Sequence, residues 1–118
     1  MEKQKNENIK DEFKKKINEI DNQIDNEKKK IKKIDSIQEE VTALNKNLNK
    51  CIELLSVSIK GEKNDKMLSD MYDKNKSFYV NFSSTLDDEI SATKKKISKL
   101  NETKENLIKE NKDKNKKE

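Results

Sequence analysis

Apolar residues recur every three or four positions along the first half of the chain. With heptad position d placed at Phe13 and position a at Ile17, eleven of the fourteen a and d positions through Ile59 are apolar. The residues between them are mostly Lys, Glu, Asp and Asn. A narrow apolar stripe of this kind is typical of a helix that buries one seam against a partner helix. The pattern predicts one helix over residues about 6–58.

Two polar residues interrupt this stripe near the middle of the chain. Gln38 and Asn45 occupy a positions, and Ile37 and Leu44 stand one residue before them. We expect the seam to drift around the helix here, so that Ile37 and Leu44 replace the polar residues at the helix contact.

The single glycine marks the one predicted chain reversal. Gly61 lies near the midpoint of a sequence that has no Pro, so few other positions can end a helix or form a tight turn. Gly is the usual left-handed cap after a helix, and Asn64 or Asp65 suits the N-cap of the next one. A turn is therefore predicted near residues 59–65.

The second half of the chain repeats the helical spacing. Apolar residues separated by three or four positions extend from Met67 to Leu107, which predicts a second helix over about 66–110. The segment 111–118 has no apolar residue and is expected to be a frayed tail. The fold class is therefore all-α: a single domain, 1–118, that forms a long, coiled-coil-like antiparallel two-helix hairpin. An extended rod dimer would satisfy the same stripe.

Composition removes several classes of function. The chain contains no His and one cysteine, Cys51, so it offers neither a catalytic base of that type nor a metal-binding set. We expect no enzyme activity, no catalytic, cofactor-binding or metal-ligating residue, and no cofactor. Cys51 falls beside Ile52 and Leu55 and is expected to be a small buried residue.

Charge and hydropathy bear on partners and location. All 28 basic residues are Lys, and 24 acidic residues balance them, which weakens the case for nucleic-acid binding. No stretch is apolar enough for membrane insertion, and Met1–Lys16 lacks the apolar core of a signal peptide. We expect a cytoplasmic protein, or one exported without a cleaved signal peptide.

Methionines and aromatic residues cluster between Met67 and Phe82. Such side chains are common in helix contacts and at protein interfaces, and two helices cannot cover all of them. Exposed apolar side chains mark docking sites. The predicted partner-binding residues are Ile52, Leu55, Ile59, Gly61, Met71, Tyr72, Phe78 and Phe82.

This layout resembles the small WXG-like helical proteins of type VII secretion, and more closely those that accompany LXG toxins in Gram-positive bacteria. Ile59-Lys60-Gly61 stands where that family has Trp-x-Gly, and the aromatic residues of the second helix follow it. The resemblance implies a targeting partner, chaperone-like, that forms a heterodimer with the N-terminal helical region of a toxin or with a second small helical protein.

Two other functions fit the residues alone. A self-associating coiled-coil scaffold, as a homodimer through the a/d seam, would use the same stripe. A non-specific nucleic-acid binder would use the lysines.

Overall fold

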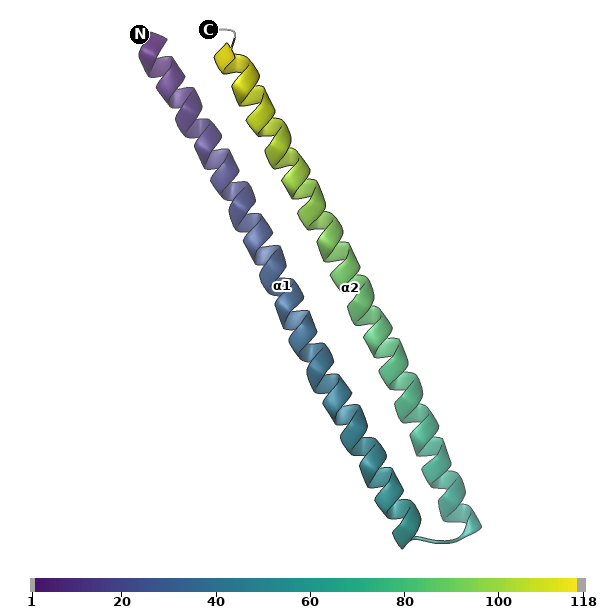
Figure 1. Cartoon of the computed structure of the whole chain (residues 1–118). Helices are drawn as coiled ribbons and strands as arrows, with labels where there is room; N and C mark the ends of the chain where they lie inside the picture. The colour runs from purple at the N-terminus through teal and green to yellow at the C-terminus, as the bar shows by residue number, and fades with distance from the viewer. Residues whose placement is uncertain (1, 117–118) are drawn as a thin grey trace. The chain divides into compact units, whose positions relative to one another are not determined.

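The computed structural model describes the backbone of residues 2–116 and the side chains of residues 10–113. It contains two α-helices, α1 (Glu2–Ser58) and α2 (Glu62–Lys116), and no strand within the described backbone. The short turn at Gly61 reverses the chain, so that α2 runs antiparallel to α1 (Figure 1). The predicted all-α antiparallel helical hairpin is confirmed.

The turn is shorter than predicted and uses its glycine differently. Within the described backbone, only residues 59–61 lie outside the helices. Gly61 has a φ of 139°, a backbone conformation that residues with a Cβ rarely adopt. Its carbonyl oxygen accepts the backbone N–H of Asp65 at 2.9 Å, so Gly61 itself occupies the N-cap of α2. Asn64 and Asp65 lie inside the first turn, where the Asp65 carboxylate faces the positive end of the helix dipole.

Both helices extend beyond their predicted ends. α1 begins at Glu2, and α2 continues through Lys116, so the frayed tail predicted for 111–118 is wrong for residues 111–116. Residues 117–118 lie outside the described part of the chain. Asn111 is half-buried one helical turn after Leu107 and continues the buried stripe, and no Gly or Pro breaks the backbone hydrogen bonds. The absence of apolar residues was therefore a poor guide to the end of the helix.

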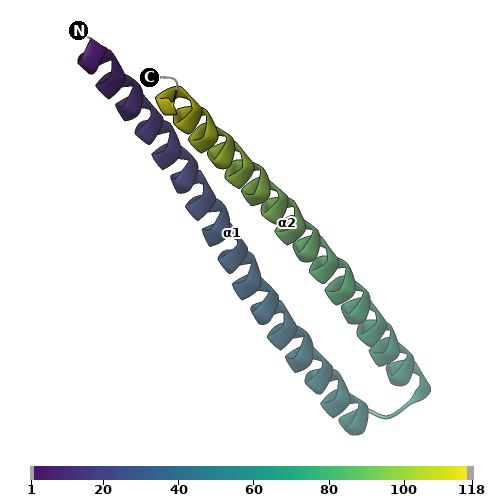
Figure 2. The same cartoon turned by 45° about the horizontal axis from the view of Figure 1, so that its top comes forward.

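The chain divides into two compact units, each formed by one segment of each helix. Unit 1 comprises residues 1–31 and 91–118, and unit 2 comprises residues 32–90. Unit 2 contains the turn and is a complete helical hairpin, whose two segments lie side by side in both views (Figures 1 and 2).

Unit 1 has an apolar helix contact. Phe13, Ile17, Ile20 and Ile31 are half-buried on α1, and Ile24 is 6% exposed, as the heptad pattern predicts. Residues 97, 100 and 107 face them from α2 with the same spacing. Between residues 10 and 31 and between 91 and 113, no large apolar side chain is exposed. Three charged residues are half-buried beside these apolar ones: Glu27, and Lys104 and Asp21, whose Nζ and Oδ1 atoms form an ion pair at 2.7 Å.

Many of the apolar residues in unit 2 are exposed and do not lie between its two helix segments. Ile34 on α1 and Leu68 and Leu86 on α2 are buried, and Val41 and Ile52 are half-buried. Polar side chains fill much of the remaining contact, and this difference from unit 1 determines where the candidate site lies.

A truncation in unit 1 tests the apolar contact. Ile24→Ala removes the most buried isoleucine of α1 and is expected to lower the free energy of unfolding by about 2 kcal/mol, measured by urea denaturation. Lys29→Ala, at an exposed position one turn away, is the control and should change it by less than about 0.5 kcal/mol. Equal effects of the two substitutions would contradict the assignment of the seam.

Candidate partner-binding surface

A polar seam joins the two helices of unit 2. The side-chain amide of Asn75 on α2 donates to Asn45 Oδ1 at 2.9 Å and to Asn49 Oδ1 at 3.1 Å on α1. Farther from the turn, the hydroxyls of Thr42 and Tyr79 are hydrogen-bonded at 3.1 Å, and Gln38 Nε2 donates to Asp87 Oδ1 at 3.4 Å. Polar groups between packed helices are stable when each finds a partner, as these do.

The polar seam corrects the predicted drift of the heptad stripe. Gln38 and Asn45 stay in the helix contact, whereas Ile37 is 42% exposed and Leu44 is 56% exposed. The reason is that both polar residues have hydrogen-bond partners on α2. The seam then shifts by one residue in the other direction, because Asn49 bonds to Asn75 whereas Leu48, the predicted d residue, is 43% exposed. The apolar residues that were expected to replace them are left on the outside of the pair.

These displaced apolar residues form one stripe along α1. Ile37, Leu44 and Leu48 each stand one residue before a half-buried seam residue, as does Cys51 before Ile52. Successive residues of an α-helix are about 100° apart, so positions separated by seven, four and three share one side of the helix. All of them lie on the same side of the seam.

A matching stripe runs along α2. Met67 precedes Leu68, and Phe78 precedes Tyr79, so both residues again lie one position before the seam. Two antiparallel helices in contact are related by a pseudo-twofold axis perpendicular to the plane that contains them. Rotation about this axis exchanges the two helices but leaves each side chain on the same side of that plane. Residues one position before the seam therefore lie on the same side of both helices. We call this surface the apolar face; it consists of Ile37, Leu44, Leu48, Cys51, Leu55, Met67, Met71 and Phe78.

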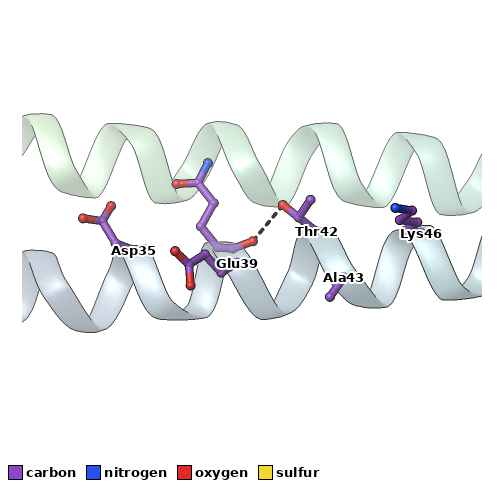
Figure 3. A pocket seen from close by; sticks show the side chains of 6 residues that line it. Asp35, Glu39, Thr42, Ala43 and Lys46 are labelled. Carbon is purple, nitrogen blue, oxygen red and sulfur yellow. Dashed lines mark hydrogen bonds between the residues drawn. The ribbon is translucent and has the colours of Figure 1, made fainter.

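The opposite side of unit 2 is mainly polar on α1. An open depression there is lined by side chains of α1 that lie in a row along the helix (Figure 3). Glu39 and Lys46 are charged, and Thr42 Oγ1 donates to the Gln38 carbonyl oxygen at 2.8 Å. The two sides of unit 2 therefore differ in degree: one carries a continuous apolar stripe on both helices, and the other is mainly polar, with Tyr72 and Val80 exposed on it.

The apolar face is confined to unit 2. Within residues 10–113, every large apolar side chain that is exposed lies between Ile37 and Val80. The equivalent positions of unit 1, one residue before each seam residue, are polar, as at Lys16, Glu19 and Gln23. Each helix is continuous, but its apolar residues are covered in unit 1 and partly exposed in unit 2.

The predicted partner-binding residues divide into three groups. Leu55, Met71 and Phe78 are exposed and belong to the apolar face. Ile52 and Phe82 are half-buried at its edge, where the Phe82 ring stacks on that of Phe78 with centroids 5.7 Å apart. The other three lie outside the face, although all are exposed: Tyr72 on the other side of the seam, and Ile59 and Gly61 in the turn.

Sequence reasoning missed five members of the face: Ile37, Leu44, Leu48, Cys51 and Met67. Cys51 is exposed, so the expectation that it is buried is wrong. The Cys51 side chain does not face α2, so the helix contact does not cover it. The signal that could have found these residues is an apolar residue immediately before each seam position on both helices.

Lysines border the face at the turn end of α2. A groove on the helix surface is lined by Met67 and Met71 together with Lys63, Lys66 and Lys74, and Asp70 is its one acidic residue. At the other end of unit 2, Asp88 and Glu89 follow one another on the same helix. The border of the face on α2 is thus basic near the turn and acidic far from it.

Other kinds of site find no support in the described residues. No group of three or more His, Cys, Asp or Glu side chains is placed to hold a metal ion among them. Neither described helix contains a segment with the length and hydropathy needed to cross a bilayer. Comparisons with protein-family models, with curated proteins and with solved structures found no match.

The polar seam is tested by removing its central amide. Asn75→Ala leaves the Asn45 and Asn49 oxygens without their donor and is expected to lower the free energy of unfolding by about 1–2 kcal/mol in urea denaturation. Asn81→Ala, exposed on the same helix, is the matched control and should be nearly neutral. If Asn75→Ala is as neutral as the control, the hydrogen bonds of the seam do not hold unit 2 together.

Proposed function

We propose that this chain is a non-catalytic helical interaction protein that binds helices of another protein through the apolar face. The observation that carries the proposal is the uncovered apolar surface on one side of unit 2, beside a polar helix contact. A hairpin that buried its apolar residues internally would have Ile37 and Leu44 in the seam. Here these residues are left available to a second pair of helices.

The chemistry of the face suits a helical partner. Leu, Ile, Met and Phe side chains at helical spacing accept the apolar stripe of another helix by ridge-into-groove packing. Flexible methionines such as Met67 and Met71 adapt to the shape of the partner. Each exposed side chain that becomes buried contributes about 1–2 kcal/mol, so a few such contacts are enough for a specific complex.

The candidate client is the N-terminal helical region of an LXG toxin. This part of the proposal rests on the resemblance in layout between this chain and the small helical partners of such toxins. In that role the chain would bind its client in the cytoplasm and target it to a type VII secretion system.

Two aspartate substitutions at equally exposed sites test the face. Leu44, at 56% exposure, lies on the apolar face, and Val80, at 53%, lies on the other side of the seam. In complex with the N-terminal helical region of an LXG toxin, Leu44→Asp is expected to weaken binding by at least about tenfold, because a buried carboxylate loses its hydration. Val80→Asp should leave the affinity within about twofold. Affinity is measured by titration calorimetry on the purified proteins.

Circular dichroism of each variant shows whether the helices are intact before binding is compared. Equal affinities of the two variants would contradict the assignment of the face. Absence of any complex with the unsubstituted chain would remove the proposed client.

A further inference from the structure

We infer that the apolar face selects a helix that is acidic where it meets the turn end of unit 2. Such a helix has an apolar stripe, flanked by Asp or Glu side chains where it crosses the groove at Met67 and Met71. This partner chemistry rests on the proposed function, because the acidic helix would occupy the same face. It adds the charge by which the face distinguishes one amphipathic helix from another.

The groove offers three ammonium groups beside two exposed methionines. Met67 is 51% exposed and Met71 is 45% exposed. Lys63, Lys66 and Lys74 line the same groove. Among the described side chains, none of these three lysines forms an ion pair or a hydrogen bond. Their ammonium groups are therefore available to pair with carboxylates of a helix whose apolar stripe covers the methionines.

The border of the face on α1 does not neutralise this charge. Asn47 and Leu54 stand one residue before Leu48 and Leu55 of the face, so they lie next to it on the outer side of α1. Neither carries a charge. On α2, Asp70 is the one acid that lines the groove. The turn end of the face therefore has a basic border that only an acidic partner matches.

A helix fits this border better than a membrane or a nucleic acid does. Asp88 follows Asp70 by 18 residues, five full helical turns, so it lies on the same side of α2. It is about 38 Å from Lys63 at 1.5 Å per residue, several times the Debye length of about 8 Å at physiological salt. A bilayer or a duplex is negative along its whole surface and would meet Asp88 at the far end. A helix can carry its acids at one end only.

The charged border contributes selectivity, whereas the apolar face supplies most of the buried area. One exposed ion pair changes an affinity by about twofold, so three pairs favour an acidic helix over a neutral one by about eightfold. A basic helix is disfavoured further by repulsion from the lysines. High salt removes the preference, because the Debye length at 1 M is about 3 Å.

Two synthetic helical peptides with the same leucine stripe are suitable probes. One carries Glu and the other Lys at the positions that flank the stripe, and circular dichroism shows whether they are equally helical. Binding of each labelled peptide to the full chain is measured by fluorescence anisotropy at low and at high salt. The Glu peptide is expected to bind at least about tenfold more tightly at low salt, and the two affinities should converge at about 1 M salt.

Two triple variants test whether the groove sets this preference. The groove variant replaces its three lysines: Lys63→Gln, Lys66→Gln and Lys74→Gln. It should bind the Glu peptide about eightfold more weakly than the unsubstituted chain does. The control variant changes the net charge equally at exposed positions of unit 1: Lys94→Gln, Lys95→Gln and Lys99→Gln. It should leave the affinity within about twofold.

Equal affinities for the two peptides at low salt, or equal effects of the two triple variants, would overturn the inference and leave helix binding by the apolar face intact. No binding of either peptide would contradict the proposed function, and the inference with it. Phosphatidylserine vesicles and a DNA duplex are offered to the same chain. If either binds more tightly than the Glu peptide, and only the groove variant loses that binding, the lysines belong to a site for that surface instead.

Discussion

The contact between two helices covers only one stripe of side chains on each, and in unit 2 hydrogen-bonded polar groups share this stripe with apolar residues. Asn75 bridges Asn45 and Asn49, and Tyr79 pairs with Thr42. These groups satisfy one another and hold the helices in register together with the buried Ile34, Leu68 and Leu86. The apolar residues one position before the seam therefore lie on the outside of the helix pair.

Both units consist of two paired helix segments, but they differ in where their apolar residues lie. In unit 1 the isoleucines of α1 lie in the helix contact, and the side chains around it are polar. In unit 2 the contact contains the polar groups, and Leu44 and Phe78 are exposed. A fixed polar contact also favours one register over its neighbours, because a shift would separate each donor from its acceptor. The polar contact of unit 2 thus fixes the relative positions of the residues that form the apolar face.

Much of the fold could be predicted from the sequence, and the candidate site only in part. The heptad stripe identified both helices, and Gly61 located the turn, because both signals are local. The position of Leu44 was mispredicted because an apolar residue beside a polar one was assumed to take its place in the seam. Whether Asn45 stays in the contact depends on Asn75, 30 residues away, and no local pattern contains that information. The same limit explains Cys51, whose neighbours in sequence are half-buried while it is exposed.

The central claim is that the apolar face of unit 2 is the surface that becomes covered in a complex. The native thiol of Cys51 reports on it directly, since it is exposed on this face and is the only cysteine in the chain. The measurement is the rate at which a maleimide alkylates Cys51 in the free chain and in its complex, at the same maleimide concentration. The account predicts that the rate falls by about tenfold or more when the face is covered. An unchanged rate in a fully formed complex would show that binding occurs elsewhere.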